Sequence, residues 1–170
     1  MKKKVLLTKI FRNEEFASEA RHGGLEKLGE LGELQDYDGE LTGADAPGVV
    51  GVIANSAPIH DSFYEEGEDL RIVARWGVGY ENANVEAATK NGVLVTITPV
   101  HMDTVAEYAI TQWLATMKRV YTLNRLSHGG DFSIIRTYDA QGSTLGIYGF
   151  GRIGQAVAMR ARPLLGEDGR

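Results

Sequence analysis

Residues 144–154, with the sequence TLGIYGFGRIG, decide the fold class expected for this chain. The second half fits the pattern G-x-G-x-x-G, with Gly149, Phe150, Gly151, Arg152, Ile153 and Gly154. A strand-like run (144–148) precedes the glycines, and a helix-like run (155–161) follows them. A strand, a glycine turn and a helix in this order predict the turn that binds the phosphates of a dinucleotide at the N-terminus of the helix.

Each glycine has a distinct physical role in such a turn. Gly149 would allow the tight turn, Gly151 would let the backbone approach a pyrophosphate, and Gly154 would let helix and strand pack closely. Because 21 of the 170 residues are glycine, the alternative is a strand-to-helix turn that holds no ligand.

The acidic residue that binds the ribose hydroxyls is expected about 20 residues after the glycines, at the end of a second strand. Glu167 and Asp168 lie near that distance but follow the helix directly, so we expect them in a loop. The sequence therefore leaves the choice between NAD and NADP open.

The first hundred residues alternate strand-like and helix-like runs, some of them continuously apolar, such as VVGVIA (49–54). This pattern predicts an α/β fold with a parallel sheet covered on both faces. The expected strands are 5–10, 34–37, 49–54, 72–75 and 93–96, and the expected helices are 14–28, 62–68 and 85–90.

A single long helix is expected over residues 103–127, with Asp103 or Thr104 as N-cap and Gly129-Gly130 at its end. It is apolar around much of its circumference, which predicts burial on two sides. Either it packs between layers of one subunit, or one face meets a second chain. Residues 131–141 are then a loop leading to the glycine motif.

The composition excludes several classes of function. The chain has no cysteine, which rules out disulfides, thiolate metal sites and cysteine nucleophiles, and a net charge of −5 argues against nucleic-acid binding. His22, His60 and His128 have no spacing that suggests a metal site. The first apolar run is shorter than the roughly 7–15 residues of an export signal, and no run is long enough for a membrane span. We expect a cytoplasmic protein.

Three ordered segments then resemble the D-isomer-specific 2-hydroxyacid dehydrogenases. They are LRIVARWGVGYENANVEAATKNGVLVTITP (70–99), TVAEYAITQWLATMKR (104–119) and TLGIYGFGRIGQAVAMRARPLLG (144–166). The resemblance covers most of the chain from Leu70 onward, whereas the first third matches only in its strand–helix rhythm.

The resemblance implies two doubly wound domains. Residues 1–100 would form a flavodoxin-like substrate domain, and residues 101–170 would begin a Rossmann domain that binds NAD, with NADP not excluded. It also implies a homodimer formed through the helix 103–127, which favours the second of the two alternatives for that helix.

For a small 2-hydroxy or 2-oxo acid substrate, the resemblance implies contacts from two loops. Backbone amides of Gly77, Val78 and Gly79 would meet the substrate carboxylate and, at Val78, the nicotinamide end of the cofactor. Asn55 and Ser56 would offer polar side chains. Both stretches can also be read as plain turns.

For the cofactor, the resemblance implies that Arg152 and Ile153 contact the pyrophosphate and that Thr104 lies nearby. This sequence departs from the family pattern at three positions. Asn84 stands where Asp is usual and can still cap a helix, and Tyr108 stands where His is usual. His101 stands where Asn is frequent, and it either faces the substrate cleft or is exposed to water.

The family's catalytic Arg, Glu and His lie later in the cofactor domain, so the sequence offers no catalytic residue by this resemblance. We expect the N-terminal part of a longer NAD-dependent oxidoreductase that acts on the CH–OH group of a D-2-hydroxy acid, and expect this chain alone to be inactive. One alternative is a non-catalytic NAD-binding or dimerising module, similar to the family's corepressor relatives. Another is an adenosylhomocysteinase-like hydrolase, against which the G-V-G and V-A-E segments argue.

Overall fold

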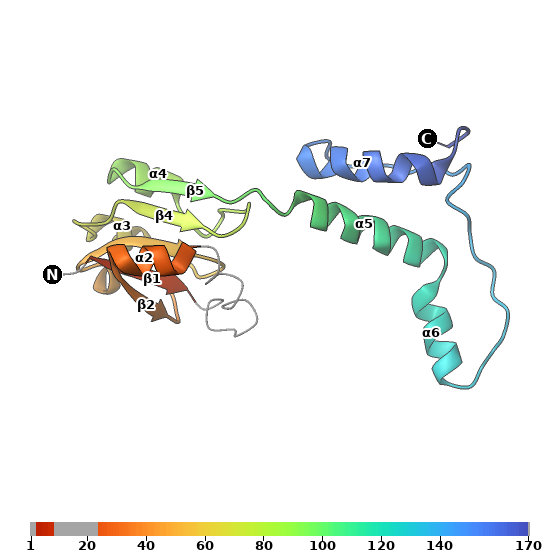
Figure 1. Ribbon diagram of the computed structural model, residues 1–170, viewed down its shortest axis with the longest axis horizontal. Coiled ribbons are helices and arrows are strands. Elements are labelled where there is room, and N and C mark those ends of the chain that lie inside the picture. Colours follow the sequence, from red (N-terminus) through yellow and green to blue (C-terminus); the bar gives the residue numbers. More distant parts are fainter. Residues whose placement is uncertain (1–2, 9–23, 170) are drawn as a thin grey trace. The chain divides into compact units, whose positions relative to one another are not determined.

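The computed structural model describes residues 3–8 and 24–169. The chain divides into two compact units, residues 1–99 and 100–170, which are described in turn (Figure 1). Most of the helix expected over residues 14–28 lies outside the described residues.

The first unit is built on a parallel sheet of five strands: β1 (Lys4–Thr8), β2 (Glu33–Tyr37), β3 (Val49–Ala54), β4 (Ile72–Arg75) and β5 (Leu94–Ile97). The strand order is β2-β1-β3-β4-β5, which is the flavodoxin-like order. The predicted α/β fold with a parallel sheet is thereby confirmed. β3 and β4 have the predicted bounds, and β5 begins one residue later than expected.

The helices of this unit are short. They are α2 (Glu26–Leu31), a 3-10 turn η3 (Gly43–Asp45), α3 (Asp61–Glu65) and α4 (Val85–Lys90). α4 has the predicted bounds, but α3 ends before the expected residue 68. The chain turns at Gly67, where a Cβ would lie 2.8 Å from the carbonyl oxygen of Phe63, and this turn brings Leu70 into the core.

The core fills one face of this sheet. Apolar side chains from the strands meet the two aromatic residues of α3 and the buried alanines of α4, and each buried large side chain stabilises the unit by about 1.5–3 kcal/mol. The cluster includes Leu6, Val49, Val52, Val73, Phe63, Tyr64, Leu70, Ala87 and Ala88. Its packing holds α3 and α4 against the strands whose carboxyl ends form the candidate site.

Tyr64 brings one polar atom into this core. Its hydroxyl is buried and has no hydrogen-bond partner among the described residues. Burial, with a smaller contribution from the negative charge of Asp61, raises the pKa of Tyr64 to about 12. The folded protein therefore favours the neutral phenol more strongly than the unfolded chain does.

This raised pKa predicts a difference between the wild-type protein and Tyr64→Phe at alkaline pH. Below pH 10 the phenol is neutral in both states; between pH 10 and about 12 only the unfolded chain loses the proton, so stability falls as pH rises. Urea denaturation from pH 8 to 12 should show a smaller alkaline loss for Tyr64→Phe. Tyr80→Phe, at an exposed side chain, is the control. Equal alkaline loss in Tyr64→Phe and the wild type would contradict the prediction.

The second unit contains α5 (Met102–Met117), α6 (Val120–His128) and α7 (Arg152–Leu165). The single helix predicted over residues 103–127 is wrong, because the chain breaks at Arg119, which adopts a left-handed conformation with φ of 50°. The start is also different: the helix begins at Met102, and His101, the N-cap, forms no side-chain cap bond.

The returning segment holds this break. The N–H of Tyr138 donates to the carbonyl of Met117 (3.0 Å), and Lys118 forms an ion pair with Asp139. The guanidinium of Arg119 lies 5.9 Å from the centre of the Tyr138 ring, within the range of a cation–π contact. The carbonyl of Met117, at the end of α5, thus accepts a hydrogen bond from the loop, and α5 ends there.

The strand predicted at residues 144–148 is also wrong: the stretch lies outside any strand or helix, and Tyr148 is fully exposed. A strand is defined by hydrogen bonds to a neighbour, and no described strand pairs with this stretch. In contrast, α7 is longer than the predicted 155–161 and continues past Pro163. α5 and α7 lie side by side (Figure 1).

Candidate functional site

The carboxyl ends of β1 and β3 meet at the point where the strand order reverses. In open α/β sheets, ligands bind in the crevice outside this point. The N–H of Asn55, just after β3, donates to the buried hydroxyl of Thr8 at the end of β1 (2.8 Å), and this hydroxyl donates to Ile53 O (3.3 Å). The side chains of Asn55 and Ser56 form no hydrogen bond within the described part of the chain.

The predicted glycine loop, Gly77-Val78-Gly79, follows the neighbouring strand β4. Gly77 has φ of 140°, a conformation that favours glycine, and its carbonyl accepts from the N–H of Thr98 (2.9 Å). Among the described residues the N–H groups of Val78 and Gly79 have no acceptor. The loop therefore lies at the carboxyl edge of the sheet with two N–H groups that no described residue accepts from.

Two residues that the sequence did not point to, Arg75 and Asn82, connect these loops. Arg75, the last residue of β4, donates to Trp76 O (2.7 Å) and to the side-chain oxygen of Asn82 (3.2 Å). Its half-buried guanidinium forms no ion pair with any described carboxylate. An arginine at the end of a buried strand is the signal that could have identified it.

Asn84 explains one departure from the family pattern. Its Oδ1 accepts from the N–H groups of Glu86 (3.1 Å) and Ala87 (3.2 Å), which confirms the predicted cap of α4. Its Nδ2 donates to Asp61 Oδ1 (2.9 Å). An aspartate could make the cap but would place a second carboxylate against Asp61, so the amide suits this chain.

In the second unit, the G-x-G-x-x-G turn leads into α7. Gly149 has φ of 91°, and a Cβ on the buried Gly154 would lie 2.1 Å from Gly149 O. Gly151 is the N-cap of α7, and apart from its chain neighbours no described residue has a heavy atom within 4 Å of the position its Cβ would take. The backbone is thus tightly packed at Gly154 and open at Gly151.

The other residues predicted in this unit lie at two helix starts. Arg152 and Ile153 form the first turn of α7, where Arg152 is exposed. His101 and Thr104 are exposed at the start of α5. Ion pairs from Arg160 of α7 to Asp103 (2.8 Å) and Glu107 (3.6 Å) connect the two helices.

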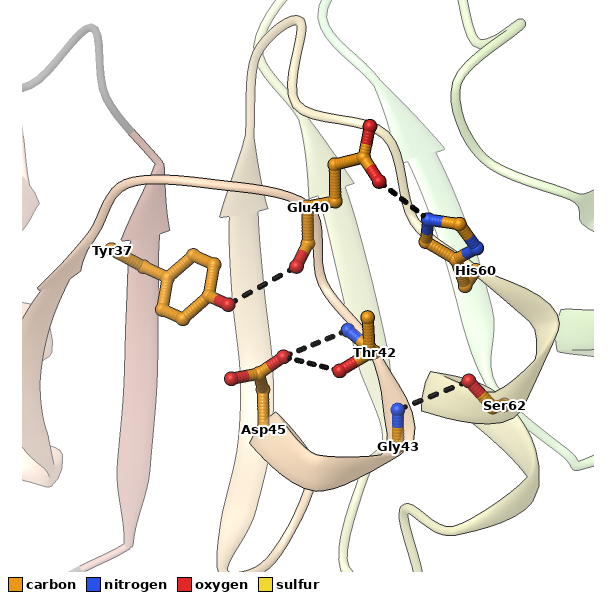
Figure 2. Close-up of polar contacts among 7 residues, drawn as sticks. All are labelled: Tyr37, Glu40, Thr42, Gly43, Asp45, His60 and Ser62. Carbon is orange, nitrogen blue, oxygen red and sulfur yellow. Dashed lines mark hydrogen bonds and ion pairs between the residues drawn. The ribbon is translucent and has the colours of Figure 1, made fainter.

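A second polar cluster, shown in Figure 2, holds the connection between β2 and β3. The N–H and hydroxyl of Thr42 donate to Asp45 (2.9 and 2.8 Å), and Gly43 N donates to Ser62 Oγ (3.1 Å). Burial acts to raise the pKa of Asp45, but hydrogen bonds from Thr42 and Tyr37 lower it below its usual value. These bonds anchor η3 to α3 and involve none of the predicted site residues.

Histidine and acidic side chains are not gathered into a metal site in the described part of the chain. His60 Nε2 lies 2.9 Å from Glu40 Oε2 in the cluster of Figure 2, and His22 lies outside the described residues. No helix of the described ranges is long and apolar enough to cross a membrane.

Comparison with known families decides the relationship. Residues 9–160 match the model of the D-isomer specific 2-hydroxyacid dehydrogenase catalytic domain. The chain belongs to this family. The three segments that suggested it, from Leu70 onward, lie largely within the matched range.

Curated relatives include the glyoxylate reductase of Thermococcus kodakarensis, 42% identical over 117 residues that cover 63% of this chain and 35% of the relative. A putative 2-hydroxyacid dehydrogenase of Staphylococcus aureus is 30% identical over 154 residues, covering 82% of this chain and 48% of the relative. The chain thus spans about a third to a half of the length of these relatives.

Solved structures share the fold. A putative D-isomer specific 2-hydroxyacid dehydrogenase from Polaromonas has a TM-score of 0.74 at 26% identity, covering 97% of this chain and 53% of its own. D-lactate dehydrogenase from Aquifex aeolicus, complexed with NAD and lactic acid, has a TM-score of 0.79 at 22% identity, covering 95% and 49%.

Proposed function

We propose that this chain is the N-terminal portion of an NAD-dependent oxidoreductase that acts on the CH–OH group of a D-2-hydroxy acid. The proposal rests on the glycine turn before α7 in a chain that belongs to the family. The space around Gly151 is open, whereas the backbone is tightly packed at Gly154. Residues 1–100 would be the substrate domain, and residues 101–170 would begin the cofactor domain.

The cofactor would be held at the start of α7. A pyrophosphate would lie against Gly149, Phe150 and Gly151, in the space that a side chain at Gly151 would otherwise fill. The N–H groups at the N-terminus of α7 would favour its negative charge. The exposed Arg152 adds a cation, Ile153 borders the turn, and Thr104 contributes a hydroxyl from α5. When bound, the nicotinamide gives or takes the hydride; an NADP cofactor is not excluded.

The substrate would be a small 2-oxo or 2-hydroxy acid, such as the glyoxylate in the names of the relatives. Its carboxylate would accept hydrogen bonds from the N–H groups of Val78 and Gly79. Gly77 allows this close approach, and the positive charge of Arg75, which pairs with no described carboxylate, favours an anion there. Asn55 and Ser56 would orient the remaining oxygens.

The partner would be a second copy of the chain. Large apolar side chains remain exposed along α5 and α6, including Val105, Tyr108, Val120 and Tyr121. Burying such side chains is favourable by about 25 cal/mol per Å² of apolar surface, which supports a homodimer through residues 103–127.

We expect the 170-residue chain to bind NAD without reducing glyoxylate, because the proposal assigns it half of a cofactor site and no catalytic residue. Isothermal titration with NAD and NADP, and an NADH oxidation assay with glyoxylate, test both parts. Arg152→Glu should weaken NAD binding about tenfold by removing a charge-assisted contact. Arg125→Glu, on exposed α6, is the matched control.

Failure of the unmodified chain to bind either dinucleotide would contradict the proposed cofactor site. Turnover of glyoxylate by the pure chain would contradict the proposal that it is inactive alone.

A further inference from the structure

We propose that Asn82 is a positioning residue that fixes the loop after β3, residues 55–57, relative to the glycine loop after β4, residues 77–79. The inference rests on the proposed function, in which both loops contact the substrate. Asn82 itself belongs to neither loop and lies half-buried between β4 and α4.

The side-chain amide of Asn82 uses three hydrogen bonds to join the β3 loop to the end of β4. Its Nδ2 donates to the carbonyls of Asn55 (2.9 Å) and Ala57 (2.7 Å), on the two sides of Ser56. Its Oδ1 accepts from Nε of Arg75 (3.2 Å). The β3 loop is thus held at two points, and the end of β4 at one.

Arg75 passes this restraint on to the glycine loop. Its Nη1 donates to Trp76 O (2.7 Å) and to Ala54 O (3.4 Å), and it lies 3.3 Å from the position that a Cβ on Gly77 would take. The N–H of Trp76 in turn donates to Ala54 O (2.8 Å). A guanidinium oriented by Asn82 therefore packs directly against Gly77.

Only a carboxamide satisfies this arrangement. Two donors must face two carbonyls while an acceptor faces the guanidinium, and asparagine provides both on one short side chain. Aspartate keeps the shape and the contact to Arg75, but it turns two attractive contacts into repulsion between oxygens. The Asn82→Asp change therefore releases the β3 loop selectively.

Asn84 offers a matched control two residues away. It is also an asparagine with structural hydrogen bonds, but its side chain contacts Asp61, Glu86 and Ala87, and neither loop. Asn84→Ala thus weakens the same unit at a different place.

The test is carried out on the ¹⁵N-labelled 170-residue chain. Amide hydrogen exchange is followed at Asn55 and Trp76, which report on the two loops, and oxalate, a stable analogue of a 2-oxo acid, is titrated. We expect Asn82→Asp to accelerate exchange at Asn55 about tenfold and to weaken oxalate binding about tenfold, with a smaller change at Trp76 because the contact to Arg75 is kept. Asn84→Ala should leave both within about twofold and accelerate exchange at Glu86 and Ala87 instead.

Unchanged loop exchange in Asn82→Asp, or an equal change in Asn84→Ala, would overturn the inference, as would unchanged oxalate affinity. If the aspartate variant does not fold, Asn82→Ala is measured by the same two methods. Absence of oxalate binding in the unmodified chain would count against the proposed carboxylate site, whereas loop exchange would still decide the role of Asn82.

Discussion

Gly154→Ala is expected to destabilise the second unit and to abolish NAD binding. Helix propensity alone would favour alanine at this position of α7 by about 1 kcal/mol. The new Cβ, however, would lie 2.1 Å from the backbone oxygen of Gly149, so the turn or the helix must move. Overpacking of this kind costs about 1–3 kcal/mol, which outweighs the gain in propensity. Urea denaturation and isothermal titration with NAD measure the two effects.

Two other glycines separate packing from ligand binding. Gly146→Ala adds a Cβ that, apart from its chain neighbours, has no heavy atom of a described residue within 4 Å, so stability and NAD affinity should stay unchanged. Gly151→Ala should preserve stability but reduce NAD affinity about tenfold, because its methyl group would occupy the space proposed for the phosphates. If Gly154→Ala binds NAD as well as the wild-type chain does, the turn is not the cofactor site.

The parallel sheet was predictable because the sequence of each inner strand alone has the pattern of a buried strand. β3 and β4 are short, apolar and flanked by turn residues, and both were predicted with the observed bounds. The cap at Asn84 was equally predictable, since it depends on residues two and three positions away. Features that depend on local sequence were therefore accessible.

Features that depend on distant residues were not. The break at Arg119 depends on Tyr138 and Asp139, some 20 residues later, and no local pattern marks it. The strand-like run at 144–148 has the composition of a strand, but the described residues supply no strand beside it. Composition shows that a segment can pair, whereas pairing itself requires a partner.

The candidate site divides in the same way. Glycines and the polar residues after strands could be identified from their positions, but the roles of Arg75 and Asn82 required the fold. Asn82 reaches the loop of residues 55–57 across more than twenty positions of sequence. Side chains that hold a site in place act through such long-range contacts, so spacing alone does not reveal them.

Phe63→Ala is expected to have the largest effect on stability. The side chain is fully buried, and its ring packs edge-on against Tyr64 with 6.3 Å between the centres. Removing a buried phenylalanine costs about 3–5 kcal/mol, because the lost contacts leave a cavity. A domain is stable by about 5–15 kcal/mol, so the first unit should lose a large part of its stability. Urea denaturation followed by circular dichroism measures the loss.

The loss should extend to the neighbouring elements η3 and α4, because α3 is only five residues long and depends on its two aromatic anchors. Its displacement would break the hydrogen bonds that Gly43 N donates to Ser62 Oγ and that Asn84 Nδ2 donates to Asp61 Oδ1. Phe132→Ala, at a side chain that is 84% exposed, is the matched control and should change stability by less than about 0.5 kcal/mol. Equal effects of the two substitutions would mean that packing in the core does not hold α3 in place.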